Sequence, residues 1–224
     1  MTLKQKLTWL AFAATGLASM SASAATLAVN VIDKDGKPVP DAVVVIIPAQ
    51  AGSVPKQALP SELTITQSKM QFVPAVTLAP VGAKLKFVNE DPWDHHVRSS
   101  PAGMGQFSST NAGFELRLDA KPEGKPGKAV DITLDRAGVI NATLMGCHLH
   151  SSMRGFVYVS PSPWASKTSS QGLALFEDLP DGSAQIKVWH ADQLVDLPVK
   201  QMTLSPTMST TDMQLTVVPR RRRS

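Results

Sequence analysis

Residues 146–159 read GCHLHSSMRGFVYV and combine reactive side chains with an apolar run. Cys147, His150 and Met153 follow one another at intervals of three positions. The apolar run at residues 155–159 is typical of a buried β-strand, and strand-like residues also precede the cysteine. The stretch therefore predicts a loop between two strands that carries a thiol, an imidazole and a thioether.

A second stretch with histidine lies earlier in the chain, where residues 87–97 read FVNEDPWDHHV. It overlaps the end of a strand-like run at residues 83–88, so its first histidine, His95, comes shortly after a strand end. Thiolate and imidazole ligands suit both Cu(I) and Cu(II), and a trigonal Cys-His-His site with a weak axial Met holds a geometry between their preferences. A histidine after a strand, followed later by C-x2-H-x2-M between strands, is the arrangement that such a site needs.

The two stretches resemble the cupredoxin family, which includes plastocyanin, pseudoazurin and azurin, and are most similar to plastocyanin-like proteins associated with methylamine utilisation. The resemblance is carried by FVPAVTLAPVGAKLKFVNEDPWDHHV at residues 72–97 and CHLHSSMRGFVYV at residues 147–159. It covers about residues 62–160. It implies a Greek-key β-sandwich that binds one copper ion, which cycles between Cu(I) and Cu(II).

The resemblance also implies which residues hold the copper. Carried over by position, His95 and His150 are the imidazole ligands, Cys147 is the thiolate, and Met153 is the axial thioether. Asn89 would hydrogen-bond within the ligand loops and help to hold the thiolate and imidazole, as outer partners do in metal sites. The alternative is an asparagine that only stabilises the turn at its strand end.

The spacing departs from the family pattern in one respect. Ser151 and Ser152 alone separate His150 from Met153, whereas plastocyanin and pseudoazurin have a longer gap. The shorter loop would draw the thioether closer or shift the copper toward a tetragonal geometry. The same spacing occurs in binuclear copper sites, but those need a second cysteine, and Cys147 is the only one. We therefore expect a mononuclear site.

The other three histidines have open roles. Neighbouring residues of a strand point to opposite faces, so His96 should not bind the metal together with His95. We expect His96 at the rim of the site or in a hydrogen bond outside it. His148 is an electron-exit residue, an outer hydrogen-bond partner or an adventitious ligand. His190 follows Trp189 and either packs and caps its strand or approaches the copper site.

The two ends of the chain look related to each other. Residues 29–48 resemble the opening hairpin of a carboxypeptidase-regulatory-like, or transthyretin-like, β-sandwich, and residues 171–190 resemble its later strands. Half a sandwich cannot bury its own apolar face. We therefore expect an all-β protein in which residues 25–60 pair with residues 161–219, with a cupredoxin domain inserted at residues 61–160. The alternative is two consecutive domains, with the N-terminal strands joining the cupredoxin sheet.

The N-terminus predicts export. Lys4 and Lys6 precede a mainly apolar run at residues 7–20, and residues 22–24 supply a small-x-small cleavage pattern. Residues 1–24 therefore read as a secretory signal peptide, with a periplasmic mature protein. A membrane anchor is the alternative, but the run is short for a span, and no later segment is predicted to cross. A single cysteine in an oxidising compartment is expected to be buried or bound.

The charge of the chain is concentrated at its ends. The balance of 22 basic and 18 acidic residues is +4; without Lys4 and Lys6 it is +2, and without the arginines at 220–223 as well it is −2. A nucleic-acid partner is not expected, because that needs a basic face on the domain itself. The basic tail at 220–224 is expected to be solvated, with weak contact to an acidic partner or an anionic membrane surface as the alternative.

These features favour an electron carrier that serves a redox protein partner, with copper performing the chemistry. Copper delivery is the alternative, although the scattered methionines do not form the cluster that a carrier favours. A copper oxidase or nitrite reductase needs more histidines than the five present. A Cys-His nucleophile would lack oxyanion and orienting groups. We therefore do not expect an enzyme.

Overall fold

The computed structural model describes residues 24–50, 54–102, 113–134 and 141–220. Within these residues sixteen strands form four sheets and no helix occurs, which confirms the predicted all-β class. Nothing in this part of the chain is a helix long and apolar enough to cross a membrane. The predicted signal peptide, apart from Ala24, and the predicted basic tail, apart from Arg220, lie outside the described residues.

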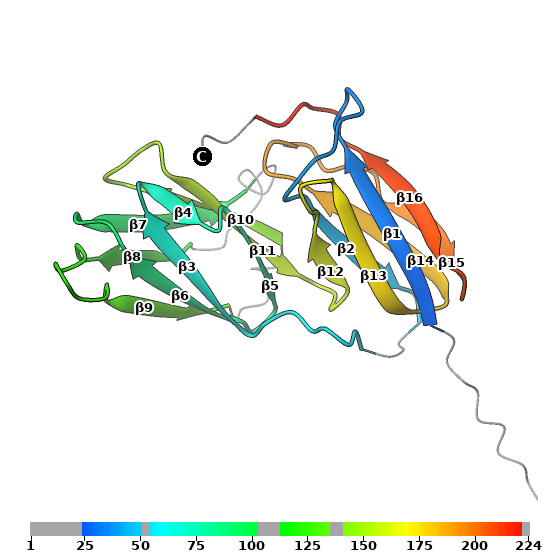
Figure 1. The fold of residues 1–224 in the computed structure, drawn as a ribbon, viewed down its shortest axis with the longest axis horizontal. Helices are drawn as coiled ribbons and strands as arrows, with labels where there is room; N and C mark the ends of the chain where they lie inside the picture. Colours follow the sequence, from blue (N-terminus) through cyan, green and yellow to red (C-terminus); the bar gives the residue numbers. More distant parts are fainter. Residues whose placement is uncertain (1–23, 51–53, 103–112, 135–140, 221–224) are drawn as a thin grey trace, which may run out of the picture.

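The middle half of the molecule, residues 62–160, is built from two of the four sheets (Figure 1). One sheet has the strand order β4-β3-β6-β9 and the other has the order β5-β11-β10-β7-β8. The strands of the middle half are β3 (Glu62–Ser68), β4 (Gln71–Val73), β5 (Val76–Pro80), β6 (Lys84–Asn89), β7 (His95–Pro101), β8 (Glu115–Leu118), β9 (Ala129–Thr133), β10 (Asn141–Cys147) and β11 (Arg154–Ser160).

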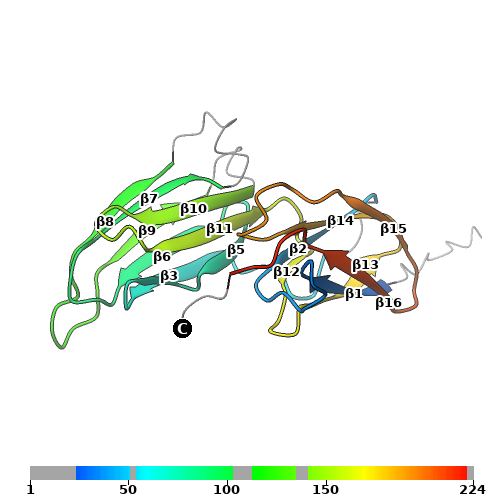
Figure 2. The same cartoon turned by 90° about the horizontal axis from the view of Figure 1, so that it is seen from above.

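The flanking half contains residues 24–50 and 161–220, seen on the other side of the molecule in Figures 1 and 2. Its sheets have the orders β13-β1-β16 and β12-β2-β14-β15, so both sheets contain strands from both ends of the chain. The strands of the flanking half are β1 (Ala24–Ile32), β2 (Val43–Pro48), β12 (Ala165–Lys167), β13 (Leu173–Pro180), β14 (Gly182–Trp189), β15 (Lys200–Leu204) and β16 (Ser209–Gln214).

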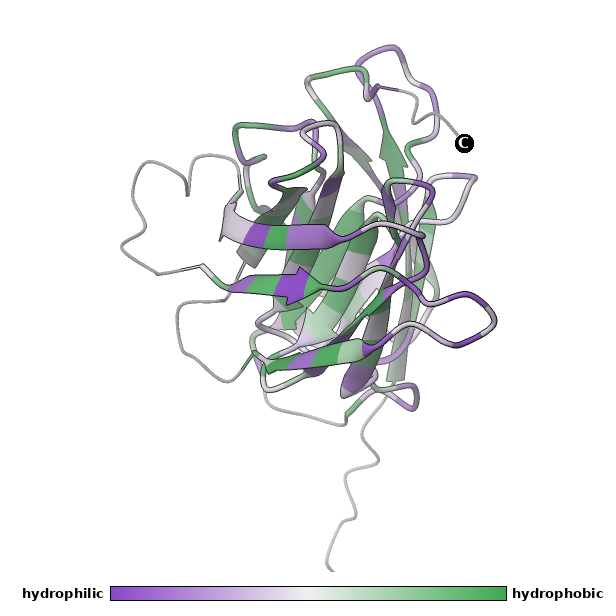
Figure 3. Ribbon diagram, turned by 90° about the vertical axis from the view of Figure 1, so that its left-hand side faces the viewer, coloured by the Kyte–Doolittle hydropathy of each residue, from purple (hydrophilic) through white to green (hydrophobic). Residues whose placement is uncertain are grey.

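Each half buries a core between its two sheets. In β6, Leu85, Phe87 and Asn89 point inward while Lys84 and Lys86 are exposed, which is the period-two pattern of a strand with one buried face. Figure 3 shows hydrophilic and hydrophobic residues alternating along the strands of this half. The core of the middle half also includes residues from the facing sheet, among them Val97, Met145 and Val157. Two sheets that share one core in this way form a β-sandwich.

A third apolar cluster joins the two halves through β2. Val44 and Ile46 face the core of the flanking half, whereas Val43 and Val45 pack toward the middle half. The ring of Trp189 in β14 lies 5.5 Å from that of Phe156 and 5.6 Å from that of Tyr158, measured between centroids. Burial, together with the nearby Asp196 carboxylate, raises the pKa of Tyr158 to about 12. The strand β2 is therefore buried on both faces.

Candidate metal centre

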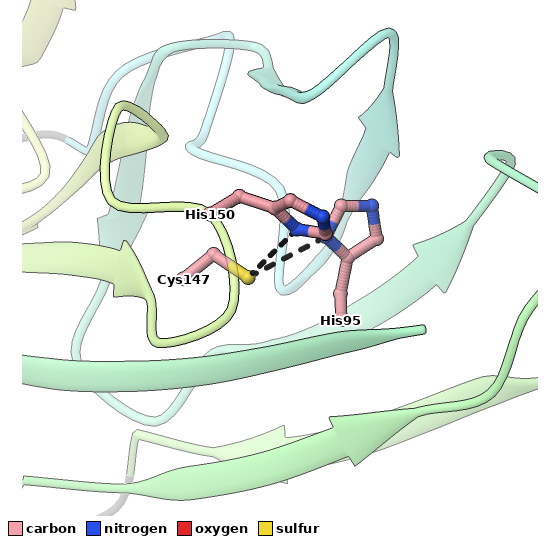
Figure 4. Close-up of side chains that lie close together, drawn as sticks. All are labelled: His95, Cys147 and His150. Atoms are coloured by element: carbon pink, nitrogen blue, oxygen red, sulfur yellow. Dashed lines mark hydrogen bonds between the residues drawn. The ribbon is translucent and has the colours of Figure 1, made fainter. Parts of the chain in front are cut away.

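The metal-ligand candidates meet at one end of the middle half. His95 is the first residue of β7, and Cys147 is the last residue of β10. The two strands are antiparallel neighbours, and Cys147 lies opposite Val97, so both side chains emerge at the same end of the sheet. His150 lies in the loop that connects β10 to β11 (Figure 4). The pairing of β7 with β10 therefore brings together residues that are 52 positions apart.

The three side chains form a compact triangle of donor atoms. The Cys147 sulfur lies 3.5 Å from Nδ1 of His95 and 3.5 Å from Nδ1 of His150 (Figure 4). The ligand atoms of all three residues lie within 4.8 Å of one another. Bonds of about 2.0 Å to imidazole and about 2.3 Å to thiolate, as found for zinc, place two trigonal ligands about 3.7 Å apart. The triangle therefore has the size that a first-row metal ion requires.

The centre is buried except at one edge. His95 is 1% exposed and Cys147 is 5% exposed, whereas His150 is half-buried. The rings of the two histidines lie 4.9 Å apart, centroid to centroid, in an edge-to-face arrangement. Trp93 packs 6.4 Å from the His150 ring and is itself partly exposed, as is Leu149. Exposed apolar side chains therefore lie beside the one histidine of the triangle that reaches the surface.

Met153 lies at the end of the same loop. Its side chain is 1% exposed and belongs to the core of the middle half, and its backbone N–H donates to the carbonyl of His150 at 3.0 Å. This bond closes the loop into a turn just before β11. At Gly155 a Cβ would lie 2.8 Å from Cβ of Phe72, so the strand that follows the loop packs tightly on its neighbours. Axial ligation by Met153 stays a prediction.

Asn89 is buried at the end of β6 and fixes the loop that leads to His95. Its amide nitrogen donates to the carbonyl of Trp93 at 2.7 Å and to that of Asp119 at 2.9 Å. Its side-chain oxygen accepts the N–H of Asp91 at 2.9 Å. These bonds act on the backbone that carries the imidazole of His95, and they tie it to the chain after β8.

Asp91 is a residue of the centre that the sequence interpretation missed. Its carboxylate lies 3.0 Å from Nε2 of His95, and both side chains are buried. Burial raises the pKa of Asp91, but hydrogen bonds from the Met70 N–H, the His95 ring and the Lys69 N–H lower it, and the net shift is downward. Glu90 and Asp94 flank Asp91 within the same short stretch, and nothing in that stretch singles it out.

The remaining histidines lie outside the triangle. Nε2 of His96 contacts a carboxylate oxygen of Glu115, and the His96 ring lies 5.7 Å from that of His148, centroid to centroid. The backbone N–H of His148 donates to the carbonyl of His96 at 2.8 Å. His190 is buried in the flanking half, where its Nδ1 accepts the N–H of Asp192 at 3.1 Å. Among the described residues, only His95, Cys147 and His150 form a potential metal-binding group of histidine, cysteine and acidic side chains.

No family model and no curated protein matches the chain. Solved structures of amicyanin resemble part of it. A Cu(I) form of an amicyanin mutant is 20% identical over 45% of this chain and 83% of its own, with a TM-score of 0.34. A reduced mutant is 19% identical over 48% and 97%, and an oxidised mutant is 17% identical over 54% and 99%, each with a TM-score of 0.33. At these TM-scores the likeness carries no weight for function, and we therefore infer function from the geometry of the centre.

Proposed function

We propose that this chain is a mononuclear copper protein that transfers single electrons. His95, Cys147 and His150 would hold the copper, with the thioether of Met153 as the fourth ligand. The observation that carries the proposal is the buried sulfur of Cys147 with an imidazole Nδ1 on either side, each 3.5 Å away.

The donor set fits copper better than the other common metals. A thiolate with imidazoles suits copper, zinc and iron, while magnesium, calcium and manganese prefer oxygen ligands. Zinc bound by three protein ligands normally keeps an open position for water. Here the thioether of Met153 follows the triangle in the same loop, and a weak axial thioether is typical of electron-transfer copper. The copper, when bound, would supply the one-electron chemistry.

The burial of the centre supports electron transfer over delivery. His95 and Cys147 are fixed at the ends of two paired strands and are shielded from solvent. Fixed ligands keep the geometry similar in both oxidation states, whereas a delivery protein must expose its ligands to release the ion. The half-buried ring of His150, with the exposed Trp93 and Leu149 beside it, would meet the redox protein partner.

The location, pathway and domain boundaries are also proposals. The predicted signal peptide at residues 1–24 supports a periplasmic protein. The resemblance of residues 72–97 and 147–159 to plastocyanin-like proteins supports a role in methylamine utilisation. The pairing of β1 with β13 and β16 supports a second sandwich made of residues 25–60 and 161–219.

The visible absorption spectrum of the mature protein with one equivalent of Cu(II) tests the metal centre. We expect an intense thiolate-to-copper band that bleaches reversibly on reduction and is absent in Cys147→Ser. The matched control is His148→Ala, which removes a neighbouring histidine outside the triangle and should keep the band. A faint spectrum that Cys147→Ser leaves unchanged would show that copper binds elsewhere through histidines.

A second measurement separates electron transfer from delivery. The reduced protein is mixed with a Cu(I) chelator, and copper loss is followed over time. An electron carrier should retain its copper while it exchanges electrons rapidly with a soluble redox dye. Rapid loss of copper to the chelator, with slow electron exchange, would favour delivery.

A further inference from the structure

We propose that Asp91 is a positioning residue for the copper centre: its carboxylate fixes the ring of His95 and preferentially stabilises Cu(II). This inference rests on the proposed function above. The geometry that carries it is that the two nitrogens of one imidazole face two different side chains, the sulfur of Cys147 and the carboxylate of Asp91. Nδ1 of His95 faces the Cys147 sulfur at 3.5 Å, and Nε2 faces an oxygen of Asp91 at 3.0 Å.

The carboxylate selects one tautomer of His95. A nitrogen that binds a metal ion carries no hydrogen, so the ring hydrogen must lie on the other nitrogen. When Nε2–H donates to Asp91, Nδ1 carries no hydrogen, and its lone pair is free to bind a metal ion beside the Cys147 sulfur. A metal-bound histidine with a carboxylate partner is more basic and better oriented than one without it.

The carboxylate is itself held rigidly by a strained turn. The backbone N–H of Lys69 donates to one of its oxygens at 2.6 Å, and that of Met70 donates to the other at 3.0 Å. Lys69 and Met70 have φ angles of 52° and 58°, a left-handed conformation that is unfavourable for residues other than glycine. The turn between β3 and β4 therefore aims two donors at Asp91, and the oxygen that accepts the Met70 N–H is also the one that faces Nε2 of His95.

The charge of the carboxylate also distinguishes the two oxidation states. Cu(II) with the thiolate of Cys147 carries a net charge of +1, and an ionised Asp91 brings this buried group to zero. Adding an electron would then leave a net negative charge in a buried place, which is unfavourable. The carboxylate therefore favours the oxidised centre and should lower its reduction potential.

Asp94 offers a matched comparison within the same loop. It is also a carboxylate close to His95 in the sequence, but it is exposed, and its oxygen accepts the N–H of Ala120 at 2.7 Å. Removing its charge changes the local electrostatics without changing the bond at Nε2 of His95. If the bond at Nε2 of His95 matters, Asp91→Asn will therefore change the Cu(II) affinity and the reduction potential more than Asp94→Asn does.

The test compares Asp91→Asn, Asp94→Asn and the unaltered mature protein by potentiometry and by Cu(II) competition. We expect Asp91→Asn to keep the thiolate band, to lose 10- to 100-fold in Cu(II) affinity, and to raise the reduction potential. A tenfold change in the ratio of Cu(I) to Cu(II) affinities corresponds to about 59 mV for one electron. Asp94→Asn should change the ratio less than about twofold. Equal shifts in the two variants, or no shift in Asp91→Asn, would overturn the proposal.

A copper-free measurement keeps the test decisive if Asp91→Asn does not fold. Nitrogen-15 NMR of the unaltered copper-free protein reports which nitrogen of His95 carries the hydrogen. We expect it on Nε2; a hydrogen on Nδ1 with a bare Nε2 would overturn the proposal. A protein with the expected tautomer but no thiolate band would instead contradict the proposed copper function and leave the positioning of His95 intact.

Discussion

Each half of the molecule buries an aspartate whose carboxylate accepts backbone N–H groups, but the two aspartates have different roles. Asp33 in the flanking half and Asp91 in the middle half are both 4% exposed. Asp33 accepts the backbone N–H groups of Asp35 and Lys37 at 2.8 and 2.9 Å, which closes the turn after β1. Asp91 likewise accepts two backbone N–H groups, but it also reaches the ring of His95.

Burial and hydrogen bonds from a turn therefore do not by themselves identify an aspartate with a functional role. Every buried carboxylate needs donors, and backbone N–H groups of a turn are the usual source. What distinguishes Asp91 is its last partner, an imidazole whose other nitrogen faces a thiol. The flanking half thus uses its buried carboxylate to shape the chain, and the middle half uses one to aim a side chain.

The largest expected effect on stability comes from truncating one large side chain in the core of each half. Phe87 in the middle half and Phe176 in the flanking half are both buried, so each change to alanine should lower the free energy of unfolding by about 3–5 kcal/mol. Phe87→Ala should also weaken the copper band, because β6 leads to the loop before His95. Phe176→Ala should leave the band intact. Urea denaturation, together with the copper spectrum of each variant, checks this. Loss of the band in Phe176→Ala would show that the copper centre depends on the fold of the flanking half.

Copper binding should stabilise one half selectively. At a free copper concentration 1,000 times the dissociation constant, the folded state gains about 4 kcal/mol. Hydrogen exchange should therefore slow in β7 and β10 on copper addition, while β1 and β13 change little. Cys147→Ala is the control and should show no such protection. Equal protection of β1 would mean that the two halves unfold as one unit.

The contact between the halves should be weaker than either core. Trp189 is half-buried between Phe156 and Tyr158, so Trp189→Ala should cost about 2 kcal/mol, less than a fully buried ring. We expect two overlapping thermal transitions in calorimetry, which Trp189→Ala should move further apart. Trp189→Phe should restore most of the contact, and Trp93→Ala, which alters an exposed ring elsewhere, should not separate the transitions.

The smallest effect concerns a surface ion pair of the middle half. The Lys84 ammonium hydrogen-bonds to Asp131 at 2.8 Å and lowers the pKa of that carboxyl. A lowered pKa means that the pair stabilises the fold above about pH 4, the ordinary pKa of aspartate, and that this contribution disappears as the pH falls through the lowered pKa. Lys84→Gln should move the pKa of Asp131 upward in an NMR titration. An unchanged pKa would show that the pair does not form in solution.

Strands can be predicted from the sequence where apolar residues within the strand itself form a continuous run or alternate with polar ones. The continuous apolar run at residues 43–47 predicts a buried strand, which is β2, and the alternation at residues 26–33 predicts a strand that corresponds to β1. The apolar pattern of residues 70–78 predicts one strand, but Pro74 separates β4 from β5, because proline cannot donate to a ladder. The pattern of residues 194–203 predicts a strand over the whole range, which is wrong for residues 194–199: β15 begins at Lys200, and Leu194 and Val195 are exposed.

The strand β7 and the role of Asp91 could not be read from local patterns. Residues 95–101 read HHVRSSP, and only His95 and Val97 are buried in this strand. Such a strand forms because β8 and β10 pair with it on either side, which is a tertiary effect. Asp91 acquires its role from the turn at Lys69 and Met70, and no spacing rule links that turn to His95.

The central position of β1 sets an order in time for the flanking half. As the chain emerges, β1 appears early, but its two sheet neighbours, β13 and β16, are among the last strands. Closing so long a stretch of unfolded chain is entropically costly and slow. Once residues 62–160 have folded, the joined ends lie far closer together, and the closure that remains is short. The middle half thus acts as a scaffold for the folding of the flanking half. Slowing the folding of the middle half should therefore delay formation of the sheet that contains β1.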